Sequence, residues 1–212
     1  MFPLYAILDT GLALERGHDP VDLARRFLEG GARLLQLRAK QASSTQFLGW
    51  ADAVCALARE AGARVIVNDR ADIALMSGAH GVHVGQDDLP PAAVRRVAAG
   101  RPLEIGLSTH TAAQIAAAAK EAVDYIAIGP VFGTGTKDTG YGAVGLSMIE
   151  AAVRESGGRP VVAIGGITLD TAPSVLQAGA SSVAVIADLL AAGDPTARVA
   201  AYLRVLRVGP GA

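Results

Sequence analysis

The sequence predicts a single-domain α/β protein that folds as a (β/α)₈ TIM barrel. Eight short apolar segments recur along the 212 residues, and Ala-rich segments with helical spacing lie between them. Most of the apolar segments lack polar alternation, which is typical of strands covered on both faces. Strand and helix alternate about every 26 residues, which requires parallel strands joined by right-handed crossovers. Eight such units in this length suit a closed barrel near the lower size limit of the fold.

The predicted elements follow one another in order along the chain. The strands are residues 4–8, 34–37, 65–67, 81–84, 104–107, 125–128, 161–164 and 182–186. Helices are predicted over residues 20–29, 45–61, 92–98, 111–121, 146–155 and 169–177. Asp19 before Pro20, Ser43 or Ser44, and Thr111 are helix-start signals that support these assignments.

An open, doubly wound parallel sheet is the alternative arrangement of the same elements. In such a sheet a dinucleotide-binding Gly-x-Gly-x-x-Gly turn is expected after the first strand, and the sequence has none there. We therefore expect a closed barrel, with residues 1–208 forming one catalytic domain and residues 209–212 forming a frayed tail.

The composition argues against several classes of protein. Hydrophobic residues make up 51% and charged residues 18%, unlike a disordered chain. The formal net charge of −1 provides no field that would attract nucleic acid or an anionic membrane. The N-terminus lacks the basic region of a signal peptide, and no run approaches the roughly 18 apolar residues of a membrane span. We expect a cytoplasmic protein without nucleic-acid or membrane partners, whose oligomeric state the sequence leaves open.

Polar side chains follow the predicted strands, at the end of a barrel where active sites form. After the second strand Gln36, Arg38 and Lys40 alternate, so their side chains share one side of the extended chain. Arg binds a phosphate through two parallel hydrogen bonds, whereas Lys acts as a point charge. This pattern predicts an anion site, with a solvated basic turn as the alternative.

Two carboxylates, Asp69 and Asp88, come after the third and fourth predicted strands. Mg²⁺ takes one or two carboxylates and completes its octahedral shell with water and substrate phosphate. Because the basic cluster follows the neighbouring strand, we expect Asp69 and Asp88 to hold Mg²⁺. Capping of the helices that follow them is the alternative.

Residues 129–142 form the longest loop after a predicted strand and contain five glycines. Backbone N–H groups of such a loop can approach an anion closely. Thr134, Thr136 and Lys137 add hydroxyls and a positive charge. The spacing is not that of a P-loop, and a lid without chemistry is the alternative.

Two phosphate subsites are expected at this end of the barrel. One lies near Arg38, Lys40 and Lys137, and the other lies near Gly166 and Ile186, after the last two strands, where barrels often bind phosphate. The sequence displays no Ser/His/Asp or Cys/His arrangement. His83 and His110 stand at strand ends, where we expect structural hydrogen bonds and not general-base roles.

Six segments, in order and with matching spacing, resemble the thiamine phosphate synthase family. They are QLRAK at 36–40, VNDR at 67–70, GVHVGQDD at 81–88, STHT at 108–111, GPVF at 129–132 followed by T-x-T-K at 134–137, and AIGGI at 163–167. The likeness runs from the first predicted strand to the last, and six motifs together are far more specific than any one of them.

The resemblance implies a reaction. It joins 4-amino-5-hydroxymethyl-2-methylpyrimidine diphosphate to 4-methyl-5-(2-hydroxyethyl)thiazole phosphate, releasing diphosphate and forming thiamine phosphate. In that family the diphosphate is thought to leave first, and the thiazole nitrogen captures a pyrimidine carbocation. Such a route needs a stabilised leaving anion and no strong protein nucleophile, which agrees with the polar residues of this sequence.

The resemblance also implies roles for individual residues, with Lys137, Ser108 and Arg38 in the catalytic set. Carried over by position, the pyrimidine diphosphate would be bound by Gln36, Arg38, Lys40 and Asn68, and Mg²⁺ by Asp69 and Asp88. The reacting diphosphate would be contacted by Ser108 and Lys137, and the thiazole phosphate by Thr134, Thr136, Gly166, Ile186 and Ala187. Ala187 departs from the family pattern, because many relatives have Ser or Thr there.

Three other functions are compatible with parts of this pattern. A thiazole tautomerase on a related barrel shares the Arg/Lys, Asn-Asp-Arg and glycine motifs, but Gln86-Asp87-Asp88 is intact here and favours the synthase. The second is a non-catalytic sensor of thiamine intermediates on the same scaffold. The third is a phosphosugar isomerase or aldolase, for which Lys137 is the sole Schiff-base candidate.

Overall fold

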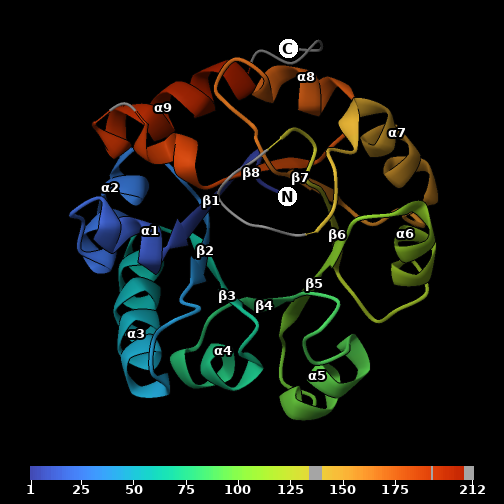
Figure 1. Ribbon diagram of the computed structural model, residues 1–212. Helices are drawn as coiled ribbons and strands as arrows, with labels where there is room; N and C mark the ends of the chain where they lie inside the picture. Colours follow the sequence, from blue (N-terminus) through green and yellow to red (C-terminus); the bar gives the residue numbers. More distant parts are fainter. Residues whose placement is uncertain (134–139, 192, 208–212) are drawn as a thin grey trace.

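Eight parallel strands close into a barrel in the computed structural model, which describes residues 1–133, 140–191 and 193–207. Figure 1 looks along the barrel and shows the helices as a ring around the strands. Each strand pairs with the next one in sequence, and β8 pairs with β1, so the open-sheet alternative is wrong. The predicted fold class is confirmed.

The strands lie where the apolar segments predicted them, within two residues at each end. They are β1 Leu4–Asp9, β2 Leu34–Arg38, β3 Arg64–Asn68, β4 Gly81–Val84, β5 Glu104–Thr109, β6 Tyr125–Ile128, β7 Val161–Ile164 and β8 Ser182–Val185. Two pairings of the register matter for the site: Asp9 lies opposite Arg38, and Asn68 lies opposite His83.

The predicted helices form α2 Pro20–Glu29, α3 Ser44–Glu60, α5 Pro91–Ala98, α6 Ala112–Ala118, α7 Gly145–Glu155 and α8 Ala172–Gln177. Three of the proposed start signals are confirmed, because Asp19, Ser43 and Thr111 accept hydrogen bonds from N–H groups in the first turns of α2, α3 and α6. The sequence analysis did not single out α1 Thr10–Glu15, α4 Ala71–Ser77, α9 Pro195–Leu206 or the 3₁₀ turn η1 Ala187–Leu190. Length does not explain the omission of α1 and α4, because the predicted helices α8 and α6 are equally short, with six and seven residues.

Two hydrophobic layers hold the barrel together. The larger packs the helices against the outside of the sheet, and the smaller fills the barrel interior. The interior layer consists of Tyr5, Ile7, Leu34, Ile66, Tyr125, Ala127, Val162 and Ala184. Gly106 makes room for one of its aromatic rings, since a Cβ there would stand 2.0 Å from the Tyr125 ring. The interior is therefore filled by side chains, and ligands have space only at its ends.

No helix in the described ranges is long and apolar enough to cross a lipid bilayer. The tail predicted at residues 209–212 lies outside the described residues, so the structure does not bear on it.

Candidate active site

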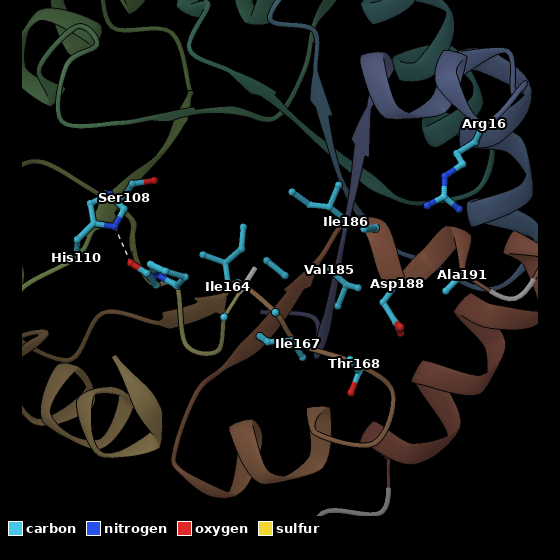
Figure 2. A pocket seen from close by; sticks show the side chains of 17 residues that line it. Arg16, Ser108, His110, Ile164, Ile167, Thr168, Val185, Ile186, Asp188 and Ala191 are labelled. Atoms are coloured by element: carbon cyan, nitrogen blue, oxygen red, sulfur yellow. Dashed lines mark hydrogen bonds between the residues drawn. The ribbon is translucent and has the colours of Figure 1, made fainter. Parts of the chain in front are cut away.

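Two cavities open side by side at the mouth formed by the carboxyl ends of the strands. The first, of about 420 Å³, lies among the ends of β5, β6, β7 and β8, and we call it the apolar cavity. Its wall includes Ser108, Gly166 and Ile186; Figure 2 shows the side chains of Ser108 and Ile186. The second, of about 610 Å³, lies between α1, the end of β2 and the start of α3, and we call it the charged cavity because Arg38 and Lys40 line it.

Arg38 is held at the mouth by Asp9, the last residue of β1. The Arg38 guanidinium donates a short hydrogen bond to Asp9 Oδ2, and both side chains are largely buried. Asp9 Oδ1 also accepts the backbone N–H of Leu12 at 3.0 Å and so caps α1. The cap fixes the carboxylate, and the carboxylate fixes the guanidinium at the edge of the charged cavity. Sequence reasoning missed Asp9, although an Asp between a strand and a helix start was a visible signal.

Lys40 pairs with Asp69 across the mouth. The distance from Lys40 Nζ to Asp69 Oδ2 is 2.5 Å, and the Asp69 side chain is 20% exposed. Asp69 has a positive φ of 62°, a conformation that costs free energy in a residue with a side chain. Its backbone N–H donates to the carbonyl of His83 on β4 at 2.8 Å. The neighbouring strand therefore stabilises a strained turn that presents the Asp69 carboxylate at the mouth.

Asp88 lies close enough to act on Asp69. Burial raises the pKa of the Asp69 carboxyl, Lys40 lowers it, and a hydrogen bond and repulsion from Asp88 raise it further. Asp88 is itself anchored, because its Oδ2 accepts the Gly85 N–H at 2.7 Å. Two carboxylates that repel each other beside Lys40 are a donor set that fits Mg²⁺. Among the described residues no group of three or more His, Cys, Asp or Glu side chains gathers into a larger metal site.

Helix capping, the alternative explanation for these carboxylates, is wrong for both. The residue before α4 is Arg70, and the residue before α5 is Pro90. Neither helix has a side-chain cap. Asp69 and Asp88 therefore lie in the turns after their strands and are not needed to start a helix.

A chain of hydrogen bonds crosses the barrel interior below the mouth. Gln36 Nε2 donates to the Tyr5 hydroxyl at 2.9 Å, and that hydroxyl lies 3.1 Å from the hydroxyl of Tyr125. Tyr125 contacts His83 Nδ1 at 2.9 Å, and His83 Nε2 contacts Ser108 Oγ at 2.8 Å. Burial raises the pKa of both tyrosines, so they stay neutral.

One donor direction satisfies every link of this chain. The Gln36 amide nitrogen can only donate, so the Tyr5 hydroxyl accepts from it and can donate a hydrogen bond to Tyr125. In the same direction the Tyr125 hydroxyl donates to His83 Nδ1, and His83 Nε2–H donates to Ser108 Oγ. Ser108 then keeps its own proton for another acceptor. His83 makes the hydrogen bonds expected of a structural histidine. Sequence reasoning missed Tyr5 and Tyr125 because their partners are distant in sequence.

The structure places Gln36 and Asn68 deeper than the cations. Gln36 is 3% exposed and Asn68 is 8% exposed, whereas Arg38 and Lys40 line the charged cavity. Ser108 is half-buried in the wall of the apolar cavity. Alternating residues of β2 thus lie at two depths, with an amide below and a guanidinium above.

Glycines shape the opposite side of the mouth. Gly166 has a φ of 63°, and a Cβ on it would stand 2.4 Å from the carbonyl oxygen of Gly133. Phe132 N–H donates to the Gly165 carbonyl at 3.0 Å. Residues 129–133 can therefore lie directly on the turn after β7. Ile186 and Ala187 complete this wall, and Ala187 lines both cavities.

His110 also lines the apolar cavity. Its Nδ1 lies 2.6 Å from the Gly129 carbonyl, and its ring stacks on Tyr141 with centroids 4.3 Å apart; Figure 2 marks the hydrogen bond. These contacts fit the structural role expected for His110. Three predicted site residues, Thr134, Thr136 and Lys137, lie outside the described residues.

Comparison of the chain with known proteins identifies one family. A family model described as thiamine monophosphate synthase matches residues 4–189. A thiamine-phosphate synthase of Koribacter versatilis is 44% identical over 209 residues, covering 96% of this chain and 95% of the relative. One of Chloroflexus aurantiacus is 41% identical, covering 96% and 91%. The solved structure of a thiamine phosphate pyrophosphorylase from Pyrococcus furiosus superposes with a TM-score of 0.88 and 32% identity, covering 99% of this chain and 97% of that one.

Proposed function

The chain belongs to the thiamine monophosphate synthase family, and on that premise we propose that it is a transferase that makes thiamine phosphate. Its substrates are the pyrimidine diphosphate and the thiazole phosphate named above. Besides the family, one observation carries the proposal: two cavities, one lined by cations and one by glycines and apolar side chains, meet at Ala187. Two phosphorylated substrates that must meet require two adjoining sites of this kind.

The charged cavity and the carboxylates beside it suit the pyrimidine diphosphate. Arg38 and Lys40 bind the diphosphate, with Arg38 oriented by Asp9. Asp69 and Asp88 would hold Mg²⁺, which when bound neutralises charge on the departing diphosphate. Gln36 precedes Arg38 by two residues on β2 and lies deeper in the barrel, so its side chain faces the pyrimidine ring rather than the diphosphate.

Bond breaking comes first in the proposed reaction. The bond between the methylene carbon and the diphosphate oxygen breaks, and both electrons leave with diphosphate. The thiazole nitrogen then donates its lone pair to the methylene carbon, forming the new C–N bond. Ser108 and Lys137 contact the reacting diphosphate, and Thr134, Thr136, Gly166, Ile186 and Ala187 bind the thiazole phosphate. Apolar side chains such as Ile164 in the cavity wall help to exclude water, which would otherwise capture the cation.

The test is a direct assay. Purified protein is incubated with Mg²⁺ and both substrates, and thiamine phosphate is followed by chromatography. We expect product only when both substrates are present, and we expect a chelator to abolish it. Absence of product from a protein shown to bind both substrates would contradict the proposal.

A thiazole tautomerase is the second candidate, because His110 lies in the wall of the apolar cavity, where it is available as an acid or base. Two variants separate the candidates. In a synthase Asp88→Asn lowers activity and His110→Asn leaves the chemical step in place. In a tautomerase His110→Asn abolishes isomerisation of the thiazole and Asp88→Asn has no effect. We also propose a cytoplasmic location and no nucleic-acid partner, in keeping with the charge balance.

A further inference from the structure

Arg16 stands at the junction of the two cavities. It follows the last residue of α1 and lines both the apolar and the charged cavity, as Ala187 does. Figure 2 shows its side chain reaching from α1 toward the segment that carries Ile186 and Asp188. None of the six family-like motifs includes Arg16, and the sequence analysis gave it no role.

The guanidinium of Arg16 has no protein partner among the residues that the structure describes. Asp9, Glu15 and Asp188 line the same cavities, yet none of them forms an ion pair with Arg16. Arg38 in contrast is paired with Asp9. The guanidinium of Arg16 therefore keeps all of its N–H donors for a ligand.

Asp188, the carboxylate in the described wall of the apolar cavity, is already bonded to other groups. Its Oδ2 lies 2.7 Å from Arg198 Nη2, accepts the Leu169 N–H at 3.2 Å and accepts a short hydrogen bond from the Tyr202 hydroxyl. Three donors on one carboxylate offset most of the repulsion that Asp188 would exert on an anion in the cavity. Within the described wall of the apolar cavity, Arg16 is the one permanently charged cation.

The phosphate expected in this cavity lacks a hydroxyl donor at residue 187, because alanine stands there. Gly166 leaves backbone space but adds no charge. A phosphate ester carries up to two negative charges, and a guanidinium binds it through two parallel hydrogen bonds. The two side-chain hydroxyls in this wall already have protein contacts: Thr168 Oγ1 lies 3.2 Å from Thr171 Oγ1, and Ser108 Oγ lies 2.8 Å from His83 Nε2. A free guanidinium adds the positive charge that a phosphate in this subsite requires.

We propose that Arg16 binds the phosphate of the thiazole substrate and takes the place of the hydroxyl missing at Ala187. The inference rests on the proposed function for the identity of that phosphate. Its place between the cavities gives Arg16 a second effect: it lies between the thiazole phosphate and the diphosphate and reduces their mutual repulsion. Arg16 is a substrate-binding residue and takes no part in bond breaking.

The test measures binding and turnover separately. In Arg16→Ala, calorimetric titration with the thiazole phosphate should show affinity about 10–100-fold weaker, the size expected for one charge-assisted contact. KM for the thiazole phosphate should rise by a similar factor, while KM for the pyrimidine diphosphate stays within about threefold. Arg25→Ala is the matched control, because Arg25 is an exposed arginine on α2 that is 3.9 Å from Asp22.

A rescue variant tests the link to Ala187. Adding Ala187→Ser to Arg16→Ala should recover about tenfold of the lost affinity, the order expected for one new hydrogen bond. An unchanged affinity in Arg16→Ala, or an equal rise in both KM values, would overturn the proposal. Failure of the proposed function looks different: wild type would bind the thiazole phosphate, lose it with Arg16→Ala and still form no thiamine phosphate.

Discussion

The two ends of the barrel carry the same kinds of ion pair but differ in what their cations contact. At the mouth, Arg38 pairs with Asp9 and Lys40 with Asp69. At the opposite end, where the strands begin, Arg64 pairs with Glu104 and Arg95 with Asp124. Exposed ion pairs contribute about 0–1 kcal/mol to stability at most sites, and in a largely buried pair such as Arg38–Asp9 the desolvation penalty offsets much of the attraction. The count of pairs therefore does not tell the two ends apart.

The hydrogen bonds beyond the ion pairs show the difference. Arg95 also donates to the carbonyls of Ala122, at 2.9 and 3.1 Å, and of Leu103, at 2.6 Å. Its donors connect α5 to the loops before β5 and β6. The guanidinium of Arg38, at the mouth, forms a hydrogen bond only with Asp9 among the described residues. An arginine bonded to backbone carbonyls stabilises loops, whereas one with donors left over is available to a ligand.

The largest effect is expected from Arg38→Ala. Removing one preorganised donor should lower kcat/KM for the pyrimidine diphosphate by about 10²–10³. Free energy of unfolding, measured by urea denaturation, should also fall, by up to about 3 kcal/mol, because Asp9 is left largely buried without its partner. A variant that loses several kcal/mol of stability and little activity would show that the mouth pair is structural, like its counterpart at the other end.

The second-largest effect is expected from Asp88→Asn. Losing one carboxylate should shift the Mg²⁺ concentration for half-maximal turnover upward by about 10–100-fold. Asp87→Asn is the matched control, because Asp87 is the exposed neighbour in the same turn. Identical metal titrations for Asp88→Asn and wild type would place the metal elsewhere.

Arg95→Ala probes the opposite end with a similar side-chain deletion. It leaves carbonyls of Ala122 and Leu103 without their donors, so free energy of unfolding should fall by about 1–2 kcal/mol. Steady-state kinetics at a temperature where the variant is folded should match wild type within about twofold. A large loss of kcat in folded protein would remove the contrast between the two ends.

The smallest effect is expected from Glu104→Gln. Burial raises the pKa of the Glu104 carboxyl, Arg64 lowers it, and Asp124 raises it. The folded protein therefore holds this proton to higher pH than the unfolded chain, and stability falls as pH rises from the unfolded pKa of 4.5 through the raised folded value. Between pH 4 and pH 7 the variant should gain up to about 1 kcal/mol relative to wild type. Plots of unfolding free energy against pH that run parallel for the variant and wild type over this range would contradict the prediction.

Much of the fold could be predicted because its signals are local. An apolar run bounded by turn residues identifies a strand wherever the strand is later placed, and Asp19, Ser43 and Thr111 cap helices within three residues of themselves. α9 begins at Pro195, after a cap by Asp194, and carried the same signal without being singled out.

The residues of the candidate site likewise divide into those with a local signal in the sequence and those whose partners are distant in the chain. Arg38, Lys40, Asp69 and Asp88 could be proposed because in a parallel barrel every strand end meets the same face. Asp9 could not be matched to Arg38 without the strand register, and the path from Gln36 to Ser108 joins residues up to 120 positions apart through Tyr5 and Tyr125. The guanidinium of Arg16 is free because Asp188 already pairs with Arg198 and Asp9 already pairs with Arg38.

By itself the sequence determined the order of strands and helices, the barrel class and the polar strand ends, because each of these depends on residues close together in the chain. Only the tertiary structure decided the register in which the strands pair, which donors are already bonded and which remain for a ligand. Those properties depend on closure, which brings β1 against β8 and places side chains from distant strands within hydrogen-bond distance.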